Sequence, residues 1–401
     1  MKILFITSSY PPFMDMQTIR NLKLIDGLID KGHKITVLSP SRTLNEKIEK
    51  KQNVDEWKTK PPLFFQLTDF VEKKIKSKFL MKILNVFGGK FLFPDVFALW
   101  SKQALKFLKT KDINNFDLAI TSSGSFTSHF IGSSISKKNS IDWIADYGDP
   151  WSLDKYGNIK FLVKFFERKV LKNCSLIFFT THSTIKFYNL FLDKYNIKKD
   201  LVFLPCGYDT MPNYEIVPKK NKQLSFTYTG VAYSQDRNLS NAILAVGENK
   251  EDAYLNIVGS YSSKYENILN VENIVNFKGR VSYEQSLTMI LESDVLLHIG
   301  NFGALQIPGK TYIYLSAPKP ILYIRQETGY DPTFELLSKF EGIVICENSI
   351  SDIDRAIKEI VQNYNGFLTL SQERVMSEEL KQFEWINVNK MFNNAIAKFE
   401  K

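Results

Sequence analysis

The stretch that decides the fold is the amino-terminal segment MKILFITSSYPPFMDMQTIRNLKLIDGLIDKGHKITVL, residues 1–38. Residues 2–7 form a short apolar run that predicts a buried strand, and a proline-containing loop follows it. Apolar residues then recur at helical spacing over 18–31, Gly32 is typical of a helix end, and 34–38 predicts a second strand. A strand, a loop, a helix and a further strand in this order are the building block of a parallel, doubly wound sheet.

The same alternation continues along the chain in two series. A predicted linker at 211–223 separates the two, and Ser282 with Gln285 predicts a capped helix start. Further strands are expected at 117–121, 141–145, 176–179, 202–204, 224–229, 254–258, 274–277, 294–299, 320–324 and 343–346, and further helices at 350–363 and 371–399.

We therefore expect an α/β protein with two Rossmann-like domains that face each other across a cleft. In open α/β sheets, ligands bind at the carboxyl ends of the strands, so the cleft is expected to lie there. The first domain is expected at 1–209, together with a carboxy-terminal helix at 381–401 that crosses back to it, and the second domain at 210–380.

The composition of the 401 residues is that of an ordinary globular chain, with 44% hydrophobic and 24% charged residues. Basic residues outnumber acidic ones by 52 to 43, and the net charge of +9 favours anionic partners. No basic stripe with interleaved aromatic residues accompanies this charge, so nucleic acid is not an expected partner. Three widely separated cysteines argue against a disulfide scaffold and favour a reduced, cytosolic setting. No apolar run of about 18 residues predicts a membrane-spanning helix.

A segment that ends in Lys310 and Thr311 looks at first like a phosphate-binding P-loop. Five residues separate Gly303 from Gly309, one more than that motif allows, so a P-loop NTPase is not expected. Gly309 still permits a tight turn, and Lys310 opens a predicted helix whose amino end attracts anions. The plain alternative is a solvated lysine at a helix start. No G-x-G-x-x-G follows the first strand, which argues against a nicotinamide oxidoreductase.

Carboxylates and tryptophans are concentrated at 142–151, directly after the start of a predicted strand. Carboxylates beside aromatic rings suit the hydroxyl groups and apolar faces of sugars, and the alternative is a capping aspartate followed by a structural turn. The four histidines are scattered, and no pair has the spacing of metal ligands. His129 follows a serine-rich loop after the strand at 117–121, and we expect it to face the cleft.

Residues 70–87 combine five lysines with a single acid, Glu72. Their apolar residues lie at helical spacing, and a basic amphipathic helix predicts contact with an anionic membrane surface. The alternative is an ordinary surface helix with a solvated lysine face.

These segments together resemble the GT-B fold glycosyltransferases of family four, the bacterial polysaccharide and glycolipid type, over nearly the whole chain. No single motif decides the resemblance, but the order and spacing of the motifs are specific. The matching segments are Tyr10-Pro11-Pro12 with Arg20, 31–37, 93–95 with Trp100, 128–132, 146–151, 204–209, 228–230, Arg237-Asn238, 277–281, 308–315 and 319–322.

The resemblance implies a retaining transferase that takes a sugar from a nucleotide-diphosphate sugar and needs neither a bound metal nor a cofactor. It implies a glycan or lipid-linked acceptor in surface polysaccharide or glycolipid synthesis, with the protein peripheral on the inner face of the cell membrane. The residues expected closest to the reaction are Asp149, His129 and Lys310. Those expected to bind the donor are Gly230, Arg237, Arg280, Gly309, Lys310, Thr311 and Ile313, and those expected to bind the acceptor are Tyr10, Arg20, Asp146 and Trp151.

One departure from the family pattern concerns Ile313. Members of the family usually carry a glutamate at this position, where it is thought to hold the nucleotide ribose, and an isoleucine cannot accept a hydrogen bond from a ribose hydroxyl. This departure keeps a second hypothesis open, a non-catalytic sugar- or lipid-binding module descended from such an enzyme.

Overall fold

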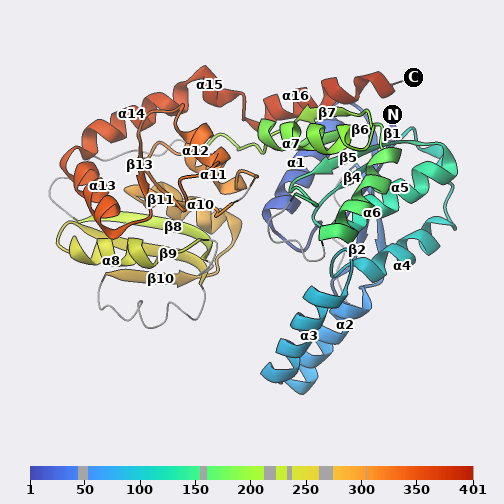
Figure 1. The fold of residues 1–401 in the computed structure, drawn as a ribbon, viewed down its shortest axis with the longest axis horizontal. Coiled ribbons are helices and arrows are strands. Elements are labelled where there is room, and N and C mark those ends of the chain that lie inside the picture. Colours follow the sequence, from blue (N-terminus) through green and yellow to red (C-terminus); the bar gives the residue numbers. More distant parts are fainter. Residues whose placement is uncertain are drawn as a thin grey trace. The chain divides into compact units, whose positions relative to one another are not determined.

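The computed structural model describes residues 1–43, 53–153, 160–211, 223–232, 237–261, 274–303 and 305–400, and residues 212–222 of the predicted linker lie outside this part. The chain divides into two compact units (Figure 1). Unit 1 is Met1–Pro205 with Ile386–Lys401, and unit 2 is Cys206–Trp385. The chain passes from unit 1 to unit 2 after Pro205 and returns after Trp385, a few residues from the boundaries expected at 209 and 380.

The strands of unit 1 form one parallel sheet in the order β3-β2-β1-β4-β5-β6-β7. Their bounds are β1 (Lys2–Thr7), β2 (Lys34–Pro40), β3 (Val54–Thr59), β4 (Leu118–Ser122), β5 (Asp142–Tyr147), β6 (Leu176–Phe179) and β7 (Asp200–Phe203). The helices are α1 (Met16–Asp30), α2 (Leu63–Phe70), η1 (Val71–Ile75), α3 (Lys78–Phe91), α4 (Ala98–Leu108), η2 (Ile113–Asn115), α5 (Thr127–Asn139), α6 (Lys160–Asn173), α7 (His182–Asp193), α16 (Trp385–Ile396) and η4 (Ala397–Phe399).

Helices cover both faces of this sheet (Figure 1), and strand β6 shows why its sequence requires them. Successive side chains of a strand point to opposite faces. Ile177 and Phe179 pack into the core cluster on one face, whereas Phe178 contacts Phe392 of α16 with ring centroids 5.2 Å apart. A continuous apolar strand of this kind is typical of a parallel sheet that is buried on both sides.

Unit 2 contains a second parallel sheet, in the order β10-β9-β8-β11-β12-β13. Its strands are β8 (Leu224–Ala232), β9 (Ala253–Tyr261), β10 (Val275–Gly279), β11 (Val295–Ile299), β12 (Ile321–Arg325) and β13 (Ile343–Glu347). Its helices are α8 (Ser240–Glu248), α10 (Tyr283–Glu292), α11 (Gly309–Ser316), α12 (Pro332–Leu337), α13 (Ile350–Gln362), α14 (Tyr364–Met376) and α15 (Glu378–Lys381). The predicted capping box at the start of α10 is confirmed, because Ser282 and Gln285 bond each other's backbone N–H groups.

The two sheets share one topological feature that positions ligands. In each, the chain first adds strands on one side of the first strand and then moves to the other side, so the direction of winding reverses between β1 and β4 and between β8 and β11. Doubly wound sheets bind their ligands at the carboxyl ends of the strands beside such a reversal. We therefore expect ligand sites at the carboxyl ends of these four strands.

The carboxy-terminal segment differs from the single helix expected over 371–399. It forms three helices, α14, α15 and α16. Ser377 interrupts the helix because its side chain accepts a hydrogen bond from the N–H of Leu380 and so begins α15. The next break occurs where the backbone pairs with Tyr208: the N–H of Tyr208 donates to the carbonyl of Phe383, and the N–H of Trp385 donates to the carbonyl of Tyr208.

Helix α16 crosses back to unit 1 and packs on α1. Asn389 and Asn393 donate to the carbonyls of Lys23 and Gly27 at 3.1 and 3.0 Å. Gly27 stands in the middle of α1, and a Cβ at this position would lie 2.3 Å from the side chain of Asn389. The glycine therefore permits the two helices to approach closely, which offsets its low helix propensity.

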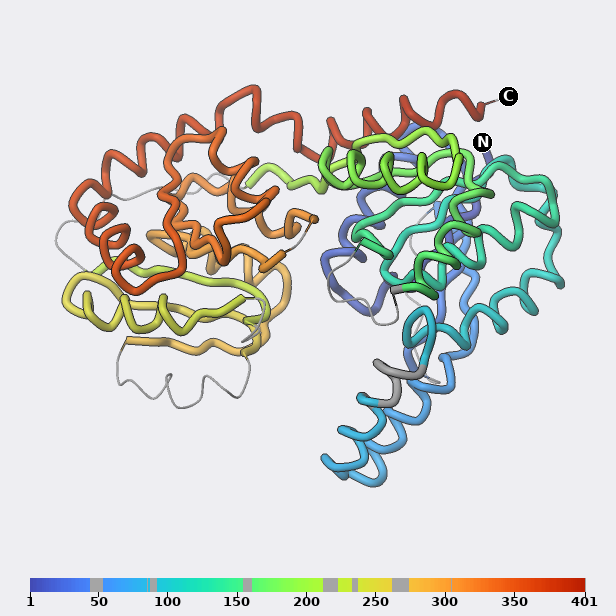
Figure 2. The backbone as a smooth tube through the Cα atoms, in the orientation of Figure 1, coloured from blue at the N-terminus to red at the C-terminus, as the bar shows by residue number. Residues whose placement is uncertain are grey.

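A helical hairpin, α2 with η1 and α3 (residues 63–91), projects from unit 1 beyond the edge of its sheet (Figure 2). Lys76 takes a left-handed conformation, with φ of 54°, and ends η1, while Ser77 caps α3 by accepting from the N–H of Leu80. None of the helices in the described part of the chain is long and apolar enough to span a bilayer.

Candidate functional site

The carboxyl end of β8 in unit 2 is shaped by two facing glycines. Gly230 pairs with Gly259 of β9, and their φ angles are 118° and 138°, which side chains other than hydrogen rarely allow. A Cβ on Gly259 would lie 2.0 Å from the carbonyl oxygen of Gly230. The two backbones therefore approach closely, and an ideal Cβ on Gly230 would lie 4.0 Å from both Lys310 Nζ and the hydroxyl of Tyr228.

Lys310 stands in the first turn of α11 and reaches over the end of β8. Its Nζ donates to the carbonyl of Thr229 at 3.0 Å and lies 3.8 Å from the ring centroid of Tyr228. Burial, and next the charge of Arg237, hold the pKa of Lys310 well below its usual value. Within the part of the chain that the structure describes, no carboxylate forms an ion pair with this lysine.

Arg237 joins Lys310 at the same edge. Its Nε donates to the side-chain oxygen of Asn301, and its guanidinium approaches the carbonyl of Val231 at 3.5 Å. Both cations lower the pKa of His298, although burial is the larger cause. His298 is the last but one residue of β11, and its Nε2 is 2.8 Å from the hydroxyl of Thr311.

The structure thus brings together most of the residues predicted to bind the donor: Gly230, Arg237, Gly309, Lys310 and Thr311 lie around the winding reversal of unit 2. Two cations held in a partly buried place favour an anionic ligand, because a bound anion would offset both their repulsion and the loss of solvation. The electrostatics of this site therefore suit a phosphate-bearing ligand.

Two of the predicted donor residues do not join this group. Arg280 is exposed in the loop after β10, and no described contact links it to Lys310 or Arg237. Ile313 lies one turn after Lys310 on α11 and is only 5% exposed, so its side chain belongs to the packed interior of the unit.

Sequence reasoning missed His298, Asn301 and Tyr314 in this site. The hydroxyl of Tyr314 accepts from the backbone N–H of Thr229 at 2.8 Å and so ties α11 to the end of β8. The spacing contained a usable signal, since Tyr314 follows Lys310 by four residues, the separation that places two side chains on one face of a helix. The sequence placed His298 in the strand expected at 294–299, but the four histidines were considered only as possible metal ligands, so its place in this site was not predicted.

In unit 1, Arg20 and Asp146 form a buried ion pair instead of an open acceptor site. The guanidinium contacts both carboxylate oxygens at 2.8 and 3.1 Å, and the two side chains are 1% and 0% exposed. Arg20 also donates to the carbonyls of Leu204 and Pro205, the last residues of unit 1 before the chain crosses. The expectation that these two side chains line the acceptor site is corrected by their complete burial.

His129 lies in the core and not at the surface where we expected it. Its ring is 0% exposed and stacks on Tyr147 with centroids 4.4 Å apart. The indole N–H of Trp143 donates to Thr121 Oγ1, which also lies 2.7 Å from His129 Nδ1, and the Nε2 atom of the ring is buried without a partner among the described residues. Burial lowers the pKa of His129 to about 3, and the ring is therefore neutral near pH 7.

Two further predicted acceptor residues, Trp151 and Tyr10, are also packed inside unit 1. Each is 4% exposed. Trp151 stacks on Phe126 with ring centroids 4.8 Å apart, and the hydroxyl of Tyr10 donates to Glu56 at 3.2 Å. Their burial contradicts the expectation of open aromatic faces for a sugar.

Asp149 is the predicted residue of unit 1 that reaches the surface. It follows the carboxyl end of β5 and is exposed, and the backbone N–H of the preceding Gly148 donates to Ser123 Oγ at 2.9 Å. At the neighbouring winding reversal, the hydroxyls of Ser8 and Ser125 are buried and have no partner among the described residues. Sequence reasoning quoted both serine-containing loops but assigned neither hydroxyl a role.

Comparison with known proteins adds the fold to this geometry. No protein-family model matches the chain, and no curated protein matches it in sequence. Sucrose-phosphate synthase from Thermosynechococcus elongatus matches with a TM-score of 0.70 at 11% identity over 99% of both chains. HepE of Anabaena in complex with UDP matches at 0.66 and 12% identity, over 99% of this chain and 100% of that one. The lipopolysaccharide outer core galactosyltransferase WaaB matches at 0.60 and 14% identity over 99% of both.

The chain has the GT-B fold. At identities of 11 to 14%, this likeness establishes the architecture and leaves the reaction to be argued from the site.

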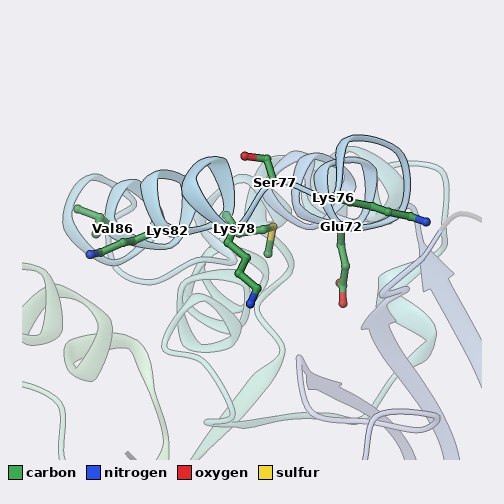
Figure 3. A pocket seen from close by; sticks show the side chains of 7 residues that line it. Glu72, Lys76, Ser77, Lys78, Lys82 and Val86 are labelled. Carbon is green, nitrogen blue, oxygen red and sulfur yellow. The ribbon is translucent and has the colours of Figure 1, made fainter. Parts of the chain in front are cut away.

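A hollow of about 710 Å³ lies on the projecting hairpin of unit 1. Lys78 and Lys82 point to the same side of the hairpin, as residues four apart on a helix do (Figure 3). The hollow is lined by Glu72, Lys76, Ser77, Lys78, Met81, Lys82 and Val86. Large apolar side chains nearby are open to solvent, with Phe79 72% and Ile83 47% exposed, so the basic apolar segment predicted at 70–87 is on the surface. The side chains at 85 and 87 are outside the described part.

Proposed function

We propose that the chain is a retaining glycosyltransferase of family four that transfers a sugar from a nucleotide-diphosphate sugar to a glycan or lipid-linked acceptor. The proposed setting is bacterial surface polysaccharide or glycolipid synthesis at the inner face of the cell membrane. The reaction in this proposal uses neither a metal nor a cofactor. Unit 2 binds the donor and unit 1 binds the acceptor.

The observation that carries the proposal is the pair of cations, Lys310 and Arg237, at the winding reversal of unit 2. When a sugar leaves a nucleotide diphosphate, negative charge develops on the departing diphosphate, and preorganised cations stabilise that charge. Lys310 is held in place by the carbonyl of Thr229 and the ring of Tyr228, so little reorganisation is needed when the charge appears. HepE, which shares the fold, has been solved with UDP bound, and this supports a nucleotide ligand.

On the acceptor side, the proposal assigns Asp149 and the serine hydroxyls at the reversal of unit 1. An exposed carboxylate can accept a hydrogen bond from a sugar hydroxyl, and buried hydroxyls without partners gain most from a ligand that pairs with them. Arg20, Asp146, Trp151 and His129 support these groups from within the core.

The membrane location in the proposal rests on the hairpin. Apolar side chains exposed beside lysines are the composition of elements that lie at the interface of anionic bilayers. Each lysine near such a surface contributes about 1 kcal/mol. Several lysines on one hairpin are therefore enough for reversible attachment.

Thermal unfolding with nucleoside diphosphates tests the donor site. A ligand present at about 100 times its Kd stabilises the native state by about 2.7 kcal/mol, which raises the melting temperature. We expect at least one of UDP, GDP, ADP, CDP and dTDP to do so, and we expect Lys310→Gln to abolish the effect. Lys339→Gln, which changes an exposed lysine of the same unit, is the matched control.

A transfer assay then separates the enzyme from a non-catalytic relative. The nucleotide sugar that corresponds to the stabilising diphosphate is incubated with a membrane extract, and release of the diphosphate is measured. Binding without release would favour the sugar- or lipid-binding module. If no diphosphate stabilises the protein and Lys310→Gln behaves as the parent, the donor site is misplaced.

A further inference from the structure

We infer that helix α6 of unit 1 is a second contact surface for an anionic lipid bilayer, separate from the hairpin. This inference rests on the proposed membrane location and extends it from one element to two. It assigns a ligand to side chains that neither the fold nor the strand-end site explains.

Helix α6 exposes large apolar side chains at its amino-terminal half. Phe161 is 81% exposed, Leu162 39% and Phe165 37%. Single exposed apolar residues are common on protein surfaces, but neighbouring ones on one short helix mark a site of interaction. Three such residues in five positions therefore require a partner for this half of the helix.

The charges of α6 identify the chemistry of that partner. Lys164, Lys169 and Lys172 are exposed, whereas Glu167, the single acid of the helix, is 0% exposed. Glu167 turns inward and accepts from the hydroxyl of Tyr188 at 2.6 Å and the N–H of Ser152 at 3.1 Å. The exposed side of α6 thus presents positive charge alone, and its partner is expected to be negative.

The cations and the apolar groups of α6 are arranged together. Lys169 Nζ lies 4.2 Å from the ring centroid of Phe165, and the guanidinium of Arg168 lies 5.7 Å from it. At a bilayer surface, long basic side chains keep their charge among the headgroups while their stems and the neighbouring rings enter the apolar region. An anionic bilayer offers headgroups to the basic side chains and an apolar region to the rings. An acidic protein surface would pair with the basic side chains but would leave Phe161 against polar groups.

The segment that directly follows the hairpin packs against helix α6. Phe93, two residues after the end of α3, packs against Phe166 on the inner side of α6 with centroids 5.1 Å apart. The start of the segment after the hairpin and α6 therefore belong to one packed region of unit 1. Two basic and apolar surfaces on one compact unit favour one common partner.

Vesicle binding by the full chain tests the inference. We expect Lys164→Gln with Lys169→Gln to weaken binding to vesicles of phosphatidylcholine and phosphatidylglycerol by about 30-fold, which corresponds to about 1 kcal/mol for each lysine. Lys102→Gln with Lys106→Gln is the matched control. These lysines are exposed at helical spacing on α4 of the same unit, where no large apolar side chain is exposed, and binding should change by less than about twofold.

A gain of signal at α6 tests insertion directly. Phe161→Trp should be quenched by brominated lipid, relative to the parent protein, when anionic vesicles are added. Leu190→Trp, on α7 of the same unit at a side chain that is 62% exposed, is expected to stay unquenched. Both substitutions are at exposed positions, so both variants are expected to fold.

The outcomes separate α6 from the hairpin and from the transferase. If Lys78→Gln with Lys82→Gln weakens binding and the α6 variant does not, α6 has no bilayer contact, although the hairpin keeps its own. If the α6 variant binds vesicles like the parent but changes the molecular mass measured by light scattering, the partner is a second copy and the inference fails. Neither result depends on nucleotide binding, which the thermal unfolding experiment decides separately.

Discussion

The two sheets of this protein have the same topology but carry different chemistry at their winding reversals. In unit 2, Lys310 and Arg237 repel each other in a partly buried place, and no described carboxylate pairs with the lysine. In unit 1, Arg20 is neutralised by Asp146 in full burial. The same scaffold therefore holds two neighbouring cations, which suit an anionic ligand, in one unit and a satisfied ion pair in the other.

The difference shows that a basic residue near a strand end indicates a ligand site only when its own hydrogen-bond partners are known. Arg20 donates hydrogen bonds to Asp146 and to the carbonyls of Leu204 and Pro205, and its side chain is 1% exposed, so it is not open to a ligand. Lys310 spends one donor on Thr229 and keeps the others. Substitutions at the two cations should therefore act on stability in unit 1 and on binding in unit 2.

The largest effect is expected from Arg20→Ala. Removing one partner of a buried ion pair leaves Asp146 charged and unpaired, which costs about 3–5 kcal/mol. The free energy of unfolding from urea denaturation measures this loss. Arg20→Met combined with Asp146→Leu removes both charges and should restore most of the stability. A small loss of stability with a complete loss of transfer would instead return Arg20 to the acceptor site.

Lys310→Ala should have the opposite profile. Turnover is expected to fall roughly 10²–10³-fold, the scale for losing one preorganised group that stabilises developing charge. The free energy of unfolding should fall little or rise, since the substitution removes a buried charge that Arg237 repels. Steady-state release of nucleoside diphosphate measures the first quantity and urea denaturation the second. Lys310→Arg, which keeps a charge, should recover part of the turnover, and a fully active Lys310→Ala would place the donor elsewhere.

Much of the fold could be predicted because buried parallel strands are continuous apolar runs. Strand β6 was expected at 176–179 and is observed at Leu176–Phe179. Strand β3 (Val54–Thr59) was missed because it is an edge strand with the polar sequence VDEWKT, and its pairing depends on the register of β2. The break before α16 was missed because Tyr208, far away in the sequence, causes it.

The site was predictable only where the signal was local. Residues 308–311 mark the start of a helix in the sequence itself, so Lys310 could be assigned to a helix start. Arg20 and Asp146 are 126 residues apart, and nothing local shows that they pair. Helix α5 carries hydroxyl-bearing residues around His129, so its buried face could not be distinguished by periodicity from its exposed one.

A third prediction uses pH to compare Glu167 with His129, two buried groups of unit 1. Burial raises the pKa of Glu167 to about 7 from 4.5 and lowers that of His129 to about 3 from 6.5. Between pH 4.5 and 7 the native state holds the Glu167 proton that the unfolded state releases, so this group makes stability fall as pH rises. Between pH 3 and 6.5 the unfolded state binds the His129 proton, so this group makes stability rise with pH.

Between pH 4.5 and 6.5 the effects of Glu167 and His129 on stability oppose each other. Replacing Glu167 by Gln should therefore leave the rise of stability with pH that His129 causes. Relative to the parent, the variant should gain about 3 kcal/mol of stability between pH 4.5 and 7, from about 1.36 kcal/mol per pKa unit. Urea denaturation of both proteins across this range measures the difference. A difference that does not change with pH would mean that Glu167 titrates alike in the native and unfolded states.

The smallest effect is expected from Asp149→Ala, which tests whether unit 1 also has a working strand end. If Asp149 accepts a hydrogen bond from a sugar hydroxyl, its loss costs about 1.5–3 kcal/mol, or roughly 10–100-fold in transfer. Stability should change by less than about 0.5 kcal/mol because the side chain is exposed. Asp142→Ala is the matched control: Asp142 is exposed at the opposite end of the same strand, where it accepts from Ser175 at 2.8 Å. Transfer should survive that change. Equal effects from both substitutions would mean that the carboxyl end of β5 has no special role, and a sharp fall in stability with Asp149→Ala alone would identify it as a capping residue of the turn.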